Sequence, residues 1–237
     1  MPRPLLIIQH ITHEGLGLLA KVLEEYNVPS STVDLSKGEP YPDPRGHSGV
    51  ITLGGPQSAN DKTAKMLVEL DNIRIILQEN IPYLGICLGM QTLVKAAGGT
   101  VTACPTKETG FFGPDGSPFT VNLTPEGSKN PLFNNLGSTL RVFQLHGETV
   151  ILPKETSLLA TGKFCKNQII KAANRAYGIQ SHFELTSELL LSWLSIDRDL
   201  QKLNKKQLID NFRDIQADYE KTGTAILKNF LHVGEII

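Results

Sequence analysis

A Gly-x-Cys-x-Gly turn at Gly85-Ile86-Cys87-Leu88-Gly89 constrains the fold of this chain more than any other stretch. The apolar run 81–86 before it is typical of a strand, and residues 88–97 after it follow a helical pattern. Side chains at 85 and 89 would collide with the neighbouring strand and helix, which explains both glycines. A helix that begins directly after Cys87 points its free N–H groups at the sulfur and favours the thiolate. The pattern predicts a nucleophile elbow, and a buried cysteine in a strand is the alternative.

The composition of the 237 residues fits a globular protein with a substantial core, because 40% are hydrophobic and 20% are charged. A net charge of −1 gives no basic field for nucleic acid. No apolar run approaches the about 18 residues of a membrane span, and a strand pattern begins at Leu5 with no cleavable signal peptide before it. The three cysteines never form C-x-x-C. We therefore expect neither a disulfide framework nor a zinc site, and we predict a cytoplasmic protein.

Strands and helices alternate through the first hundred residues, which predicts an α/β fold with a mostly parallel sheet covered on both sides. The predicted strands are 5–9, 32–35, 49–53 and 81–86, and the predicted helices are 15–26, 62–80 and 88–97. Short β-branched segments then predict antiparallel additions at 100–102, 119–123, 139–145, 149–151, 158–164, 168–172 and 177–182. Helical patterns follow at 186–195 and at 204–233, where Asn204 is the predicted cap. We interpret 1–237 as one domain, with a core of about 1–185 and a helical extension of about 186–237.

A second stretch with chemical content is Tyr177-Gly178-Ile179-Gln180-Ser181-His182-Phe183-Glu184. On an extended chain His182 and Glu184 face the same way. Glu184 can then fix the imidazole tautomer while His182 shares a proton with Cys87. Alone, H-x-E indicates a surface pair or a core histidine, but downstream of a cysteine elbow it predicts a triad.

These stretches resemble the class I (triad-type) glutamine amidotransferases and are most similar to the glutaminase domain of GMP synthase. The resemblance rests on four motifs, which are Leu53-Gly54-Gly55-Pro56-Gln57-Ser58, Gly85-Ile86-Cys87-Leu88-Gly89-Met90-Gln91, Leu145-His146-Gly147-Glu148-Thr149 and Gly178-Ile179-Gln180-Ser181-His182-Phe183-Glu184. It runs from about Leu5 to Glu184. The tail from Leu185 is similar to the extension of standalone bacterial members that carry no fused synthetase.

The resemblance implies a three-layer αβα sandwich and hydrolysis of the glutamine side-chain amide through a cysteinyl thioester. It implies a triad of Cys87, His182 and Glu184, with backbone N–H groups of Gly55 and Leu88 as the oxyanion hole. The residues it implies for holding glutamine's α-amino and α-carboxylate ends are Gln91, His146, Gly147 and Glu148. It implies no cofactor and no metal. The sequence departs from the family at Ser181, at Phe183 inside the usual H-P-E, and at Glu148 in place of Asp.

Three other functions stay open at this point. A γ-glutamyl peptidase would use the same thioester chemistry, and an open rim around Ser181 and residues 104–118 would favour it. A regulatory or binding subunit would not need an intact triad. Gly15-Leu16-Gly17-Leu18-Leu19-Ala20 with Asp34 matches a loose dinucleotide fingerprint, but a small-residue contact between helix and sheet is the plainer interpretation. We expect glutamine as substrate, no nucleic acid or membrane partner, and either a separate synthetase subunit or a homodimer.

The remaining polar and sulfur-bearing residues receive structural interpretations. His10, His13 and Glu14 are expected at the surface or in a loop near the site rim rather than as metal ligands. Cys104 and Cys165 are expected to be packing residues. The charged stretch 193–206, which holds the single tryptophan, is expected to be a solvated surface or a helix junction.

Overall fold

The computed structural model describes residues 3–237, and residues 1 and 2, on which the signal-peptide prediction partly rests, lie outside it. The described residues form a nine-stranded sheet whose first five strands in spatial order run parallel. These five strands are β2 (Ser30–Asp34), β1 (Leu5–Gln9), β3 (Gly49–Thr52), β4 (Tyr83–Ile86) and β11 (Ala176–Ile179). The antiparallel continuation is β10 (Asn167–Ala173), β9 (Ser157–Gly162), β6 (Thr120–Leu123) and β7 (Thr139–Arg141).

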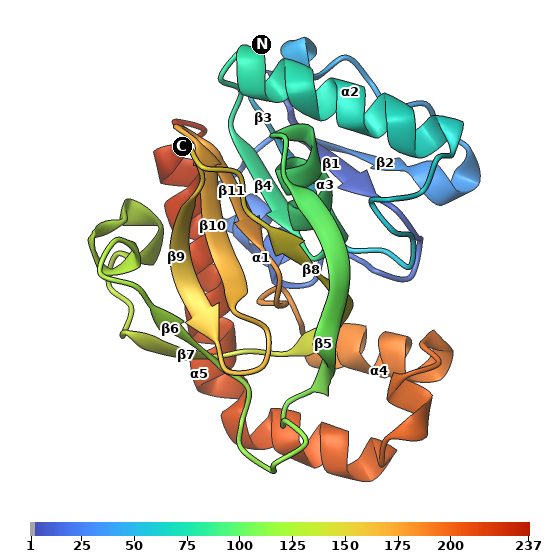
Figure 1. The fold of residues 1–237 in the computed structure, drawn as a ribbon, viewed down its shortest axis with the longest axis vertical. Coiled ribbons are helices and arrows are strands. Elements are labelled where there is room, and N and C mark those ends of the chain that lie inside the picture. The colour runs from blue at the N-terminus through green and yellow to red at the C-terminus, as the bar shows by residue number, and fades with distance from the viewer. Residues whose placement is uncertain (1–2) are drawn as a thin grey trace.

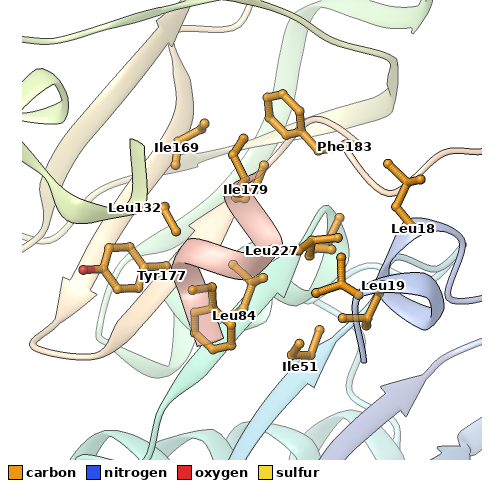
Figure 2. Close-up of a cluster of buried hydrophobic side chains, with 14 of the residues drawn as sticks. Leu18, Leu19, Ile51, Leu84, Leu132, Ile169, Tyr177, Ile179, Phe183 and Leu227 are labelled. Carbon is orange, nitrogen blue, oxygen red and sulfur yellow. The ribbon is translucent and has the colours of Figure 1, made fainter. Parts of the chain in front are cut away.

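Both faces of the parallel strands are covered by helices, so the predicted three-layer αβα fold is confirmed. Alternate residues of β1 enter two different cores, Leu5 and Ile7 in one and Leu6 and Ile8 in the other. The first core packs against α1 (Leu18–Glu25) and α5 (Lys205–Val233), and the second packs against α2 (Ala64–Gln78) and α3 (Leu88–Ala96). Figure 1 shows α5 passing behind β9 and β10. Figure 2 shows side chains from α1, α5 and the sheet meeting in the first core.

Helix boundaries follow the local capping chemistry. Thr63 accepts a hydrogen bond from Met66 N and begins α2, and Asn204 accepts one from Gln207 N and begins α5, as the sequence predicts. Helix α1 begins at Leu18, three residues later than the predicted range, because Gly17 has a φ of 51° and a non-helical conformation. Single 3₁₀ turns lie at Leu35–Lys37, Pro44–Gly46, Gly127–Lys129, Pro131–Phe133 and Leu200–Lys202.

A second, two-stranded sheet pairs β5 (Thr100–Gly110) with β8 (Gln144–Ile151) in antiparallel fashion. The predicted division into strands 139–145 and 149–151 is wrong, because β7 ends at Arg141 and β8 runs without interruption from Gln144. Strand β5 is also much longer than the predicted 100–102. Ala103 pairs with Glu148 and Glu108 with His146, so residues 104–107 bulge opposite Gly147.

The C-terminal helices α4 (Ser187–Ile196) and α5 form a third core with aromatic residues from the β5–β8 region. Trp193 is only 1% exposed, and its ring centroid lies 5.9 Å from that of Phe143. The stretch 193–206 connects α4 to α5, as the helix-junction expectation has it. The expectation of a solvated surface is wrong at Trp193 but holds for residues 201–206, which are exposed. Among the described helices, none combines the length and the apolar character that crossing a membrane requires.

Candidate active site

The elbow that the sequence predicts is present between β4 and α3. Cys87 stands at its apex with φ 51° and ψ −105°, a strained conformation for a residue with a side chain. A Cβ on Gly85 would lie 2.2 Å from Gly89 O, and one on Gly89 would lie 2.3 Å from Thr52 O. Glycine is therefore required at both positions, once against the helix and once against β3.

His182 and Glu184 form a buried ion pair two residues apart. His182 Nδ1 lies 2.6 Å from Glu184 Oε1, and Phe183 N donates to the other carboxylate oxygen at 2.9 Å. Burial lowers the pKa of His182, but the Glu184 carboxylate and the Cys87 thiol outweigh it and raise that pKa well above its ordinary value. Among the residues described, His182 Nε2 has no hydrogen-bond partner. This nitrogen is the one left to exchange a proton with Cys87.

Cys87 and His182 open into one cavity of about 520 Å³. The other predicted site residues that line it are Gly55, Gln91, His146, Gly147 and Glu148. Two predicted residues do not line the cavity. Glu184 is hydrogen-bonded to His182, and Leu88 follows Cys87 as the first residue of α3. The structure thus brings seven of the nine predicted residues to one cavity and places the other two next to residues that line it.

Gln180 contacts Cys87, although the sequence did not predict this contact. Its Nε2 donates to Cys87 Sγ at 3.7 Å, and its Oε1 accepts from Gln91 Nε2 at 3.2 Å. Gln91 Nε2 also lies 3.4 Å from Glu148 O. A buried amide chain therefore links the sulfur to β8. The only advance signal was the position of Gln180 two residues before His182, inside a stretch already singled out.

The helical extension forms one wall of the triad. The Trp193 ring of α4 packs edge-on against the His182 ring, with centroids 4.9 Å apart. Tyr219 of α5 donates its hydroxyl to His182 O at 2.6 Å. Both contacts were missed by sequence reasoning because they join segments more than ten residues apart without any motif. Trp193 thus packs against the imidazole itself, and Tyr219 holds the backbone of the same residue.

One glycine of the loose dinucleotide fingerprint, Gly17, contacts the triad segment. Leu18 N at the start of α1 donates to Glu184 O at 2.8 Å. A Cβ on Gly17 would lie 1.9 Å from that same oxygen, so the backbone of Glu184 fills the space that a phosphate would need. Asp34 accepts hydrogen bonds from Ser36, two residues after it, and from Thr12 in the loop after β1. This geometry supports the interpretation that the stretch makes a close packing contact. The partner in that contact is the triad segment and not the sheet.

The early histidines and Glu14 divide into two groups. His10 lies in the loop directly after β1, in agreement with the loop expectation, but it is buried and not at the surface. Its Nε2 pairs with Glu69 at 2.9 Å and its Nδ1 lies 3.0 Å from Gly54 O. It therefore holds the Gly54–Gly55 loop. His13 and Glu14 line the cavity, in agreement with a position at the site rim. Burial raises the pKa of Glu14 to about 7.

Comparisons with family models, curated proteins and solved structures all find glutamine amidotransferases or glutamine-hydrolyzing enzymes. The family model described as glutamine amidotransferase class-I matches residues 16–190. The glutamine amidotransferase-like protein YfeJ of Salmonella typhimurium is 29% identical over 218 residues, which span 89% of this chain and 88% of YfeJ. GMP synthase of Borreliella burgdorferi is 32% identical over 141 residues, which span 59% of this chain but 25% of that enzyme. A glutamine amidotransferase crystal structure from Thermotoga maritima matches with a TM-score of 0.86 at 27% identity, covering 98% of this chain and 99% of that one.

The matched stretch, residues 16–190, covers most of the chain and contains the cysteine elbow, the Gly54–Gly55 loop and the His182–Glu184 pair. Sequence, site geometry and comparison agree, and the chain belongs to the class-I glutamine amidotransferase family.

Proposed function

We propose that the protein hydrolyses the side-chain amide of glutamine to glutamate and ammonia, with Cys87 as the nucleophile. One observation supports this most strongly. A strained cysteine at an elbow opens into the same cavity as a histidine whose far nitrogen is held by a buried carboxylate. A binding subunit on the same scaffold would need neither the strained backbone at Cys87 nor the raised pKa of His182.

The proposed hydrolysis uses Cys87, His182 and Glu184 in the following steps. Cys87 Sγ attacks the amide carbon, and its proton resides on His182 Nε2, which Glu184 supports through Nδ1. Backbone N–H groups of Leu88 and Gly55 are the proposed donors to the oxyanion. His182 then protonates the amide nitrogen, the C–N bond breaks, and ammonia leaves a glutamyl thioester on Cys87. Water cleaves the thioester with His182 as the base, which releases glutamate and the free thiol.

The ends of glutamine are proposed to lie against the β8 wall. His146, Gly147 and Glu148 border the cavity, and Ser58 fixes the Glu148 carboxylate with a 2.9 Å hydrogen bond. We propose that residues 146–148 receive the α-amino and α-carboxylate groups. Gln91 Nε2 already contacts Gln180 and Glu148, so we propose that Gln91 supports this wall through those contacts.

The proposal also covers the acceptor that receives the released ammonia. The relative named GMP synthase is glutamine-hydrolyzing, and the chain spans a quarter of its length. We propose that ammonia passes to an acceptor held by a separate synthetase subunit, and a homodimer is the alternative assembly. Of the two features that would favour the γ-glutamyl peptidase alternative, Ser181 is fully buried and gives it no support, whereas Lys107 of the 104–118 stretch lines the cavity.

The test measures glutamate and ammonia release from glutamine beside amine release from γ-glutamyl peptides. We expect turnover of glutamine by the wild type and loss of turnover in Cys87→Ser. Faster cleavage of γ-glutamyl peptides than of glutamine would replace this proposal with the peptidase. Wild-type turnover in Cys87→Ser would refute the nucleophile.

A further inference from the structure

Two cysteines that the proposed reaction does not use meet the His146 side chain beside the cavity. Cys104, His146 and Cys165 each offer one ligand atom, and these atoms all lie within 4.8 Å of one another. Cys104 Sγ lies 3.6 Å from His146 Nδ1. His146 and Cys165 are buried, whereas Cys104 is half-buried and gives the cluster access to solvent. Thiol and imidazole groups at this spacing are the donor set that zinc prefers.

The fold brings this cluster together from three separate segments. His146 lies in β8, and Cys165 lies in the turn between β9 and β10. The β5 bulge over residues 104–107 places Cys104 on one side of His146 and Glu108 on the other. No C-x-x-C spacing exists, so the expectation of packing cysteines and no zinc site followed from sequence separation alone.

The Cys104–His146 distance suits a tetrahedral ion, and Cys165 Sγ lies within 4.8 Å of both ligand atoms. With Zn–S of about 2.3 Å and Zn–N of about 2.0 Å, tetrahedral geometry places sulfur and nitrogen ligands about 3.5 Å apart. The Cys104 Sγ to His146 Nδ1 separation of 3.6 Å matches that value. Three protein ligands leave one position of the ion for water.

A buried carboxylate orients the histidine as it does in metal sites. His146 Nε2 lies 2.8 Å from Glu108 Oε2, and the Glu108 residue is only 1% exposed. Gln168 Nε2 donates to the same oxygen at 2.9 Å and Cys165 N donates to Oε1 at 3.3 Å, so this carboxylate is itself fixed. With the Nε2 proton directed to Glu108, Nδ1 can offer a lone pair to an ion on the thiol side once it gives up its contact with Glu148 O. A carboxylate behind a ligating imidazole is the arrangement that sets tautomer and basicity in zinc sites.

We propose that Cys104, His146 and Cys165 bind a Zn²⁺ ion, with Glu108 positioning the histidine. Two thiolates neutralise the charge of the ion, and the imidazole remains neutral toward Glu108. Glu148 O lies 3.0 Å from His146 Nδ1. Binding of the ion replaces that contact.

The location ties the ion to the active-site wall. His146 is the central residue of a segment in which Leu145 O accepts from Cys87 Sγ at 3.8 Å and Glu148 O accepts from Gln91 Nε2. An ion at this point fastens β8 to β5 and to the β9–β10 turn. The inference does not rest on the proposed function, because metal binding is measured without any substrate.

The test uses reduced full-length protein and Co²⁺ as a spectroscopic probe, followed by zinc quantification. We expect one equivalent of metal per chain, with thiolate-to-cobalt charge-transfer bands and the visible bands of tetrahedral cobalt. Cys87→Ser is the matched control, since it removes the remaining cysteine. It should bind cobalt with the wild-type spectrum. The double variant Cys104→Ser/Cys165→Ser should lose both the spectrum and the zinc.

Two further measurements separate ligation from folding. Circular dichroism of the metal-free double variant should match the metal-free wild type, and zinc should raise the thermal midpoint of the wild type only. Glu108→Gln should keep one equivalent but bind zinc about 10- to 100-fold more weakly. The proposal is wrong if reduced wild-type protein takes up no metal, or if the double variant binds it as the wild type does. A spectrum that depends on Cys87 instead would also overturn it.

Discussion

Replacing Gly17 with alanine should damage the triad from outside the cavity. The new Cβ would lie 1.9 Å from Glu184 O, and real Cβ contacts essentially never fall under 3.0 Å, so the two atoms must separate by about 1.1 Å. The His182–Glu184 contact is 2.6 Å long. If the Glu184 carboxylate moves by the same amount along the line from His182 Nδ1 to Glu184 Oε1, the two atoms lie beyond hydrogen-bonding range.

The expected effect follows from that displacement. A 1 Å misplacement of a catalytic group costs about 10²-fold in rate, so we expect kcat for glutamine hydrolysis to fall by about that factor. The positive φ of 51° at Gly17 adds a loss of about 1–3 kcal/mol in the free energy of unfolding. A coupled glutamate assay gives kcat, and urea unfolding gives the stability.

Gly15→Ala is the matched control, because a Cβ there meets only Leu189 Cδ1 at an ordinary 3.7 Å. Both glycines belong to the dinucleotide-like stretch, yet only Gly17 touches the triad segment. We expect near wild-type kcat from Gly15→Ala. A folded Gly17→Ala protein with wild-type kcat, or equal losses in both variants, would refute this reasoning.

Three further predictions concern groups around the imidazole and the sulfur. Gln180→Leu removes the donor to Cys87 Sγ, and kcat should fall about two- to tenfold, the effect of one hydrogen bond, as steady-state kinetics will show. Tyr219→Phe leaves His182 O without its 2.6 Å partner, so the free energy of unfolding should fall by about 1–3 kcal/mol in urea; unchanged stability would contradict the contact. Burial raises the pKa of Glu14 from 4.5 to about 7. The folded state therefore favours the protonated form of Glu14. The free energy of unfolding that this preference contributes is fully present below pH 4.5 and is lost as the pH rises to about 7. Glu14→Gln should flatten that part of the stability–pH curve, and an unaltered slope would assign it to another group.

The local elements of the fold were predictable because their causes are local. The buried run of β1 has the predicted bounds, and Asn204 caps α5 through its own side chain. The elbow was predictable because Gly85 and Gly89 are required by contacts with its own helix and with the adjacent strand. His182 and Glu184 pair within one short segment, so their spacing already carries the geometry.

The features that sequence reasoning missed depend on contacts between distant segments. Strand β8 is continuous because β5 pairs along it, and no local signal in residues 145–148 announces that pairing. Trp193 is buried because the His182 ring lies against it. Gly17 resembled a nucleotide-binding glycine because close approach of a backbone is the same requirement whether the partner is a phosphate or Glu184 O. Cys104 and Cys165 meet at His146 only in the folded chain.

The central claim is that Cys87 carries a glutamyl thioester during turnover. The direct measurement is rapid acid quenching of the protein with glutamine, followed by peptide mass spectrometry. We expect a glutamyl adduct on the peptide that contains Cys87, absent from Cys87→Ser and from protein without glutamine. Glutamate release with no adduct at Cys87, or an adduct on Cys104 or Cys165 instead, would contradict the account.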